Sequence, residues 1–230
     1  WPDHVVVTHP ANWGPFKTDL LEQAARRASY PPVSLLAEPV AAATSYAAAE
    51  RVAPGTVVAV YDLGGGTFDA TVLVKTDDGF AVRGQPEGIE RLGGIDIDQA
   101  VLAFADRSLG GAIGALDPED PDALGAAARI RRECVEAKEA LSDDTEVTIT
   151  VSLPERTERV RLTRHELEEM VRPSLLETIH CLRRAIHGAG LSSDQVDRVL
   201  LVGGVSRMPL VAELVGAELG RPVAVDALVE

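Results

Sequence analysis

The pattern of apolar and polar residues in the first fifty positions alternates between strand and helix periods. Apolar runs at 5–8 and 33–37 predict two short buried strands. A helical apolar repeat at 18–29 and an alanine-rich segment at 39–51 predict helices. Pro39 stands at the first position of the second helix, where its missing N–H group costs nothing. Strand, helix, strand, helix is typical of an α/β protein.

The rest of the chain predicts two hairpins, further helices and a late strand. Strands are predicted at 56–62, 68–74, 80–84, 146–151, 158–162 and 198–202. Helices are predicted at 96–107, 122–141, 163–187 and 207–219. Thr163 and Glu166 have the spacing of a capping box, which marks the start of the third of these helices.

Composition and charge narrow the class of protein. A chain of 230 residues with 46% hydrophobic and 25% charged residues is typical of a globular protein, and about 70% of its surface can be buried. The net charge of −14 repels polyanions, so we expect no nucleic-acid partner. Cys134 and Cys181 lack a C-x-x-C spacing and suit a reducing compartment such as the cytoplasm.

Neither a membrane span nor an export signal is predicted in this stretch. No run of about 18 apolar residues occurs, and no signal-peptide pattern is present. The chain begins at Trp1 rather than Met and enters a strand pattern almost at once. We interpret it as a piece of a longer protein.

The strongest chemical signal is a glycine-rich turn between two acids, Asp62-Leu63-Gly64-Gly65-Gly66-Thr67-Phe68-Asp69. Glycines let backbone N–H groups approach phosphate oxygens, because no Cβ blocks the approach and positive φ angles are accessible. Acids at each end suit the water shell of Mg²⁺. The alternative is an ordinary tight hairpin, but three glycines exceed what a two-residue turn needs. A strand follows the turn and no Gly-Lys-Ser/Thr is present, so it is neither a Walker loop nor a dinucleotide fingerprint.

Two further glycine pairs precede helices. The first, at 93–94, leads into Asp96 and Asp98, and taken alone it indicates a helix start capped by Asp96. The second, at 203–204, follows an apolar strand, where ligands of α/β sheets gather. Ser206 is expected to cap the helix that comes after it.

Two other positions admit a structural and a functional interpretation. Glu38 places a carboxylate at a helix N-terminus, which either compensates the helix dipole or orients a water beside a bound phosphate. Lys138 and Ser142, four residues apart, are predicted to share a helix face with Val135, and a solvated face is the default interpretation.

Taken together, these segments resemble the nucleotide-binding domain of the seventy-kilodalton heat-shock chaperones, the DnaK family, within the actin-like ATPase superfamily. The resemblance is carried, in the family's order, by residues 7–11, 38–43, 62–69, 92–98, 137–142 and 201–209. It implies an α/β actin-like ATPase fold of the ribonuclease H-like type, with a complete second lobe and part of the first.

The resemblance also implies a division into subdomains. Residues 1–52 would be a partial base of the first lobe, 53–92 with 172–230 the base of the second lobe, and 93–171 its outer subdomain. Because residues 1–52 would lack sheet partners, we expect self-association or poor order there.

Similarity to the family implies roles for individual residues. Thr67, Asp62 and Asp69 would lie at the phosphates and the metal, the two acids holding Mg²⁺ through water, and Glu38 would lie near the attacking water. The implied nucleotide contacts are Gly64, Gly65, Gly66, Gly93, Gly94, Lys138, Ser142, Gly203, Gly204, Ser206 and Arg207.

The implied function is that of an ATP-binding chaperone ATPase domain of the stress response, which binds ATP or ADP with Mg²⁺ and works with co-chaperones and a nucleotide-exchange factor. The family's first phosphate loop and catalytic lysine have no match here, so we expect negligible hydrolysis by this chain alone. An alternative is a non-catalytic nucleotide-sensing or scaffold module, for which Val135 in place of Glu and Thr18 in place of Arg are the supporting observations. A sugar kinase of the same superfamily is a third interpretation.

Overall fold

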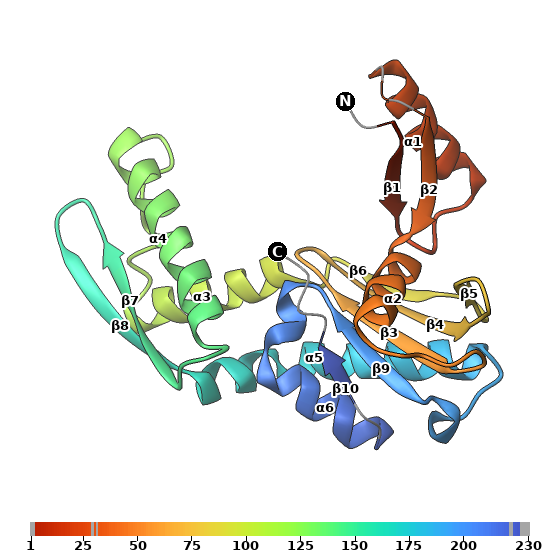
Figure 1. Ribbon diagram of the computed structural model, residues 1–230. Coiled ribbons are helices and arrows are strands. Elements are labelled where there is room, and N and C mark those ends of the chain that lie inside the picture. Colours follow the sequence, from red (N-terminus) through yellow and green to blue (C-terminus); the bar gives the residue numbers. More distant parts are fainter. Residues whose placement is uncertain (1–2, 29, 31, 221–222, 226–230) are drawn as a thin grey trace.

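The computed structural model describes residues 3–28, 30, 32–220 and 223–225 (Figure 1). It has three parts, which we call the N-terminal layer (residues 3–37), the central sheet with its covering helices, and the outer arm (residues 94–163). Figure 1 shows the N-terminal layer and the outer arm projecting from opposite sides of the central sheet. No helix in the described part of the chain is both long and apolar enough to cross a membrane.

The N-terminal layer is a two-stranded parallel sheet with one helix beside it. The strands are β1 (Val5–His9) and β2 (Val33–Ala37), as predicted, and the helix is α1 (Pro15–Arg27). α1 begins three residues before the predicted start, because Gly14 is the N-cap and Pro15 suits the first helical turn.

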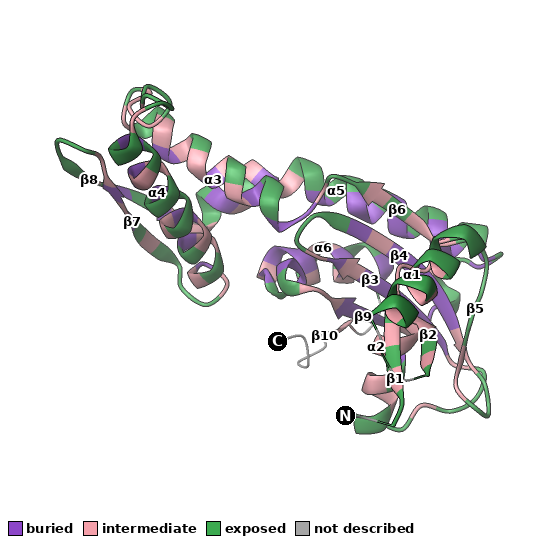
Figure 2. Ribbon diagram, turned by 90° about the horizontal axis from the view of Figure 1, so that it is seen from above, coloured by how far each residue is buried: buried purple, intermediate pink, exposed green. Residues whose placement is uncertain are grey.

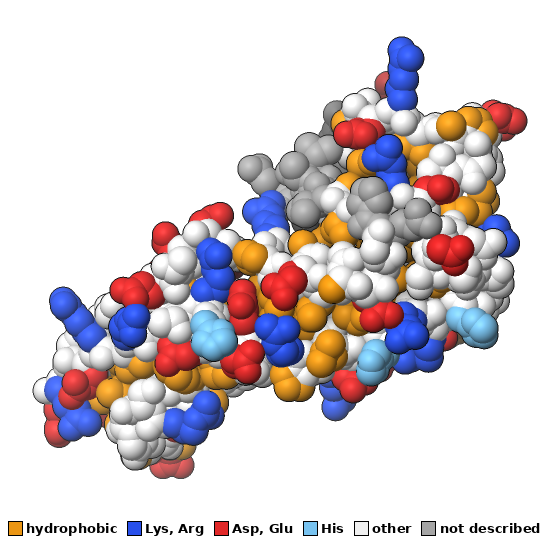
Figure 3. All heavy atoms as spheres, turned by 90° about the horizontal axis from the view of Figure 1, so that it is seen from below, with side chains coloured by type: hydrophobic (Ala, Val, Ile, Leu, Met, Phe, Trp, Pro, Cys, Tyr) orange, Lys and Arg blue, Asp and Glu red, His pale blue; other side chains and the backbone are white. Residues whose placement is uncertain are grey.

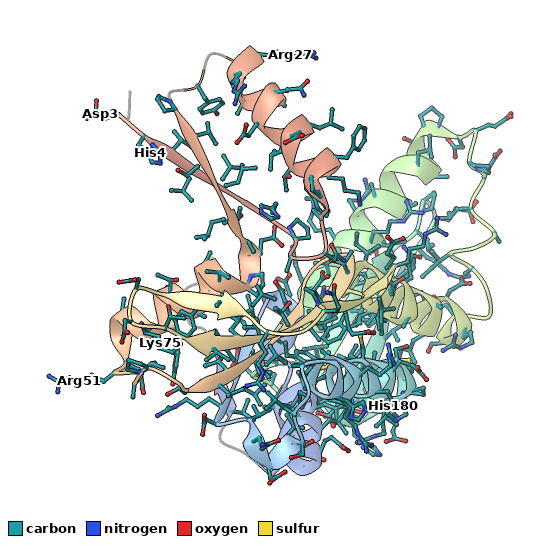
Figure 4. The ribbon with its side chains drawn as sticks, turned by 90° about the vertical axis from the view of Figure 1, so that its right-hand side faces the viewer. Asp3, His4, Arg27, Arg51, Lys75 and His180 are labelled. Carbon is teal, nitrogen blue, oxygen red and sulfur yellow. The ribbon has the colours of Figure 1, made fainter. Side chains whose placement is uncertain are left out.

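The predicted apolar face of α1 is only partly covered. No residue of α1 is buried, and Leu20 on that face is exposed. Figure 4 shows Arg27 at the far end of the helix, pointing away from the rest of the molecule. The N-terminal layer therefore contributes little core of its own.

The central sheet has the strand order β10-β9-β3-β4-β5, and β6 pairs with the same edge of β4 as β5 does. Its strands are β3 (Val57–Leu63), β4 (Thr67–Lys75), β5 (Phe80–Val82), β6 (Glu87–Glu90), β9 (Arg198–Val202) and β10 (Val223–Val225). β3 and β4 form the predicted antiparallel hairpin, whereas β9 lies parallel to β3. This pairing confirms the predicted hairpin and the strand at 198–202.

The apolar run of β3 is explained by cover on both faces of the sheet. Val58 and Val60 pack with Ala43 of α2 (Glu38–Ala49) on one face. The alternate residues, including Tyr61, pack on the other face in the core that contains α5 (Arg164–Gly188) and α6 (Pro209–Leu219). Figure 2 shows the resulting buried strands of the sheet. Because both faces of such a strand are buried, its sequence is a continuous apolar run rather than an alternation of apolar and polar residues.

The outer arm contains two helices and a hairpin. They are α3 (Gly94–Ser108), α4 (Pro121–Ala140), β7 (Glu146–Ser152) and β8 (Thr157–Thr163). The chain returns to the central sheet through α5, which is about 37 Å long at 1.5 Å per residue. The predicted capping box is confirmed at its start, where Thr163 N donates to Glu166 Oε2 at 2.9 Å. α5 runs without a break through residues 171 and 172, where the predicted outer subdomain ends and the second part of the second-lobe base begins.

Two short strands, β6 and β10, were not predicted from the pattern. β6 has the sequence Glu-Gly-Ile-Glu, which has little strand propensity, and it is a strand because it pairs with residues 67–70 of β4.

Figure 3 shows acidic and basic side chains interspersed over the face seen from below, with small apolar patches between them.

Candidate functional site

Two glycine turns converge on a third, the hairpin loop that joins β3 to β4. A Cβ on Gly93 would lie 2.5 Å from Gly66 N, and a Cβ on Gly203 would lie 2.4 Å from Leu63 O. Gly203 also has a φ of 88°, which favours glycine. The turns at 93–94 and 203–204 therefore pack directly against the backbone of the 62–69 turn, and this packing requires glycine at both positions.

Hydrogen bonds fix the orientation of the 62–69 turn. Gly94 N donates to Gly64 O at 3.0 Å, and Ile95 N donates to Gly65 O at 2.8 Å. These donors are amides at the start of α3, which have no partner within the helix. Gly64 N donates to Thr67 O at 3.1 Å within the turn itself. In the described residues, the Gly65 and Gly66 amides donate to no protein acceptor.

The glycines at the tip of the turn are not required by the fold. A Cβ on Gly65 or Gly66 would have no heavy atom of the protein within 4 Å. Gly64, Gly65 and Gly66 all lie outside the positive-φ region, so the turn makes no use of that freedom of glycine. Their value is the open approach to the backbone, which is what an external ligand needs.

A pocket of about 590 Å³ lies beside this turn, a volume within the range of small-molecule sites. It is bounded by the 62–69 turn, the start of α3, the end of α4 and the turn after β9. Its lining residues are Gly64, Gly65, Gly94, Lys138, Glu139, Ala140, Ser142, Asp143, Gly204, Val205, Arg207 and Met208. Seven of the eleven implied nucleotide contacts are thus brought together from four separate segments. They are Gly64, Gly65, Gly94, Lys138, Ser142, Gly204 and Arg207.

The end of α4 differs from the predicted solvated face. Lys138 Nζ lies 2.7 Å from Asp98 Oδ1, and the two side chains are only 13% and 21% exposed. A charge pair of this kind, at a pocket wall, is not a solvated face. Ser142 does not share a helix with Lys138 either, because α4 ends at Ala140 and Ser142 lies in the turn that follows.

The turn after β9 corrects a second expectation. Ser206 does not cap the next helix, because α6 begins at Pro209 and its N-cap is Met208. Residues 204–207 form a short 3-10 helix instead, and Ser206 is buried with its hydroxyl donating to Val202 O. Arg207 is exposed at the pocket.

The carboxylates of Glu38, Asp62 and Asp69 lie close to one another at the base of the 62–69 turn, where β3 ends and β4 begins. Asp62 and Asp69 are directly opposite in the β3–β4 register, where like charges destabilise a hairpin. Burial, together with the charges of Glu38 and Asp69, raises the pKa of Asp62 to about 6. Burial and the charge of Asp69 also raise the pKa of Glu38, which is the first residue of α2. This arrangement places negative charge where a cation would be stabilising.

Asp69 has two polar neighbours of its own. Burial raises its pKa, and a hydrogen bond from Thr67 opposes that shift. Asn12 Nδ2, from the N-terminal layer, donates to Asp69 Oδ1 at 3.4 Å. The N-terminal layer therefore reaches the acidic end of the turn.

A family model described as Hsp70 protein matches residues 3–227 of this chain. The chain belongs to the Hsp70 family. Its mixed α/β content fits that family, in agreement with the resemblance found in its motifs.

Curated Hsp70 relatives similar to this chain are named as HscA chaperones. The HscA homolog of Bordetella pertussis is 39% identical over 216 residues, which cover 94% of this chain and 33% of that relative. The HscA homolog of Pseudomonas putida is 37% identical over 216 residues, with 94% and 33% covered. HscA of Escherichia coli is 36% identical over 224 residues, with 96% and 33% covered. The chain spans about a third of the length of the curated relatives it matches.

The acidic end of the 62–69 turn has the donors for a hydrated metal ion rather than for a directly ligated one. The described residues contain no group of three or more His, Cys, Asp and Glu side chains arranged to ligate a metal ion directly. Paired carboxylates nevertheless fit Mg²⁺, which keeps several of its waters when it binds. The donor set therefore suits a hydrated Mg²⁺ held by outer hydrogen bonds.

Several residues of this pocket and of the acidic end of the turn were not predicted from sequence. Val205 and Met208 line the pocket, and Asn12 contacts Asp69 from a segment far away in the chain. Asp98 was noted beside its glycine pair but not assigned to the site. Only the tertiary structure brings it to Lys138, 40 residues later.

Proposed function

We propose that this chain is a nucleotide-binding ATPase domain of an Hsp70 chaperone and that its ligands are ATP or ADP with Mg²⁺. The observation that carries the proposal is the 62–69 turn, at whose exposed tip the Gly65 and Gly66 amides donate to no acceptor in the described residues. Amides of this kind bind phosphate oxygens. The adjacent pocket has room for the rest of a nucleotide.

We assign the two ends of the nucleotide to the two ends of this site. The triphosphate or diphosphate would contact Gly64, Gly65, Gly66 and Thr67, with Arg207 and Gly204 on the far rim. The base and ribose would lie against Lys138 and Ser142, which line the pocket at the end of α4. Gly93, Gly203 and Ser206 would act indirectly, because they hold the turns in place from behind.

The acids are assigned to the metal and to water. Asp62 and Asp69 would hold the water shell of Mg²⁺, which when bound neutralises phosphate charge. Glu38 would accept a hydrogen bond from the attacking water and orient it. Phosphoryl transfer depends mainly on such positioning and charge neutralisation.

We further propose the subdomain division of an actin-like ATPase, with 1–52 as a partial first-lobe base, 53–92 and 172–230 as the second-lobe base, and 93–171 as the outer subdomain. Coupling of nucleotide state to movement between lobes is part of this proposal. We expect negligible turnover by this chain alone, since none of its three lysines matches the family's catalytic lysine and each has a partner within the chain. Lys17 lies over the Trp13 ring, Lys75 donates to Thr76 O, and Lys138 pairs with Asp98.

Calorimetric titration with Mg-ADP tests the proposed function. Gly65→Ala should weaken ADP binding at least about tenfold, because a methyl group would face the phosphates while meeting no protein atom. Gly79→Ala is the matched control, since Gly79 also has no neighbour within 4 Å and no positive φ but lies at the opposite end of β4. Wild-type affinity in Gly65→Ala, or no ADP binding by the unsubstituted chain, would overturn the proposal.

A further inference from the structure

Arg164 places a positive charge at the start of a helix. It is the first residue of α5, where the backbone amides carry partial positive charge and an acidic residue would be stabilising. Arginine at this position is unfavourable for α5 itself. The contacts of its side chain with another part of the molecule offset that cost.

The guanidinium of Arg164 donates to three carbonyl oxygens in the turn after α4. Its Nε lies 2.8 Å from Leu141 O and 3.1 Å from Asp144 O, and its Nη2 lies 3.2 Å from Ser142 O. Arg164 N also donates to Thr145 O at 2.9 Å. The last carbonyls of a helix have no partner within it, and a cation beside them is favourable. Arg164 therefore caps the C-terminus of α4 from outside.

The turn that Arg164 holds is a wall of the pocket. Ser142 and Asp143 line the pocket, and Lys138 lies one turn earlier in α4. Ser142 N donates to Glu139 O and Asp143 N donates to Ala140 O, both at 3.0 Å. The amides of the turn are thus bonded to α4 and its carbonyls to Arg164, so the turn is ordered before any ligand arrives.

We propose that Arg164 is a positioning residue, which holds the 141–145 turn in the shape that receives the base and ribose of the nucleotide. The inference rests on the proposed function and deepens it. The phosphate-binding turn at 62–69 is held by other contacts, from the starts of α3 and η2 (Gly204–Arg207). Loss of Arg164 would therefore weaken recognition of the base and ribose and leave phosphate binding intact.

Lysine cannot replace Arg164 in this role. Its ammonium is a single point charge, whereas the planar guanidinium reaches three carbonyls that lie in different directions. Arg161→Lys is the matched control, because Arg161 lies on the neighbouring strand β8 and pairs with Glu146 at the exposed surface.

Two measurements test the positioning role. In calorimetry, Arg164→Lys should weaken Mg-ADP binding about tenfold and change Mg-tripolyphosphate binding by less than about twofold, while Arg161→Lys should change neither. In hydrogen exchange without ligand, Arg164→Lys should speed exchange of the 142–145 amides about tenfold and leave those of 94–96 unchanged.

The outcomes separate this inference from the proposed function. Unchanged exchange at 142–145, unchanged ADP affinity, or equal losses of ADP and tripolyphosphate binding in Arg164→Lys would each overturn the positioning role. Failure of the unsubstituted chain to bind ADP would overturn the proposed function itself, and with it the assignment of this turn to a nucleotide.

Discussion

Tyr61 Oη and Thr178 Oγ1 lie 2.6 Å apart in the interior, between the strand that carries Asp62 and the helix α5 that joins the outer arm to the central sheet. Thr178 Oγ1 donates to Leu175 O at 2.6 Å, so the Tyr61 hydroxyl is the donor to Thr178. Burial raises the pKa of Tyr61 and keeps the phenol neutral. This bond ties α5 to β3 one residue before the acidic end of the site.

Tyr61→Phe should lower the free energy of unfolding by about 1–2 kcal/mol, because it leaves Thr178 without its donor while the ring still packs on Phe68. Urea unfolding measures the change. A double-mutant cycle with Thr178→Val should give a coupling energy of about 1 kcal/mol. Tyr30→Phe, at an exposed position, is the control, and strictly additive effects of the Tyr61 and Thr178 substitutions would contradict the bond.

Gly93→Ala should lower the free energy of unfolding by about 2–3 kcal/mol, since its Cβ would lie 2.5–2.7 Å from backbone atoms of residues 65 and 66. Relief of this overlap requires a shift of the backbone in one of the two turns. Gly65→Ala should change it by less than about 0.5 kcal/mol, because the added methyl group meets no protein atom. Thermal and urea unfolding of both variants check this contrast. Equal stability of the two would show that the 93–94 turn does not pack on the 62–69 turn.

The pKa of Asp62 predicts how stability depends on pH. Its value in the folded protein, about 6, exceeds the ordinary 3.8, so between these values the folded state binds more protons than the unfolded state. Stability from this group therefore falls as pH rises through that window. Asp62→Asn should raise the free energy of unfolding at pH 7 by about 1–2 kcal/mol, after a discount for solvent screening.

Urea unfolding at pH 4, 5, 6 and 7 measures this effect. The advantage of Asp62→Asn should shrink as pH falls and be small near pH 4, where the wild-type carboxyl is protonated when folded and about 40% protonated when unfolded. If Asp62→Asn raised the free energy of unfolding by the same amount at every pH, the charge of Asp62 would not be the cause of the gain.

The Lys138–Asp98 pair should matter more than an exposed pair. Lys138→Met leaves the Asp98 carboxylate partly buried without its cation, and we expect a loss of about 1–3 kcal/mol in the free energy of unfolding. Arg26→Met, which breaks the exposed pair with Glu22, should cost less than about 0.5 kcal/mol. In a cycle with Asp98→Asn, the double variant should recover part of the loss. No recovery would show that the two charges act independently.

Local patterns predicted most elements but failed where a distant segment decided the outcome. The β3–β4 hairpin was predictable because two strong β runs flank a glycine turn. β6 was not, because its pairing with β4 compensates for a polar sequence. Ser206 was expected to cap a helix, yet a 3-10 turn intervenes and its hydroxyl bonds back to β9.

The residues of the site also fall into those that a local motif predicts and those that only a contact with a distant segment reveals. The glycine turns and the acids at 62 and 69 were visible in the sequence because each is a short motif with its own chemistry. The Lys138–Asp98 pair was not, since its partners are 40 residues apart. Arg164 carried one available signal, a cation at the first position of a helix whose capping box was already recognised.

The sequence by itself determined the family, the order of the helices and of the longer strands, and which backbone segments are free of side chains. Those properties depend on residues close together in the chain, whose spacing sets the local conformation. Only the tertiary structure decided which glycines are needed for packing and which leave amides open, and which cation faces which carbonyl or carboxylate. These are contacts between segments far apart in sequence, and their energies depend on distance and burial, which no local pattern contains.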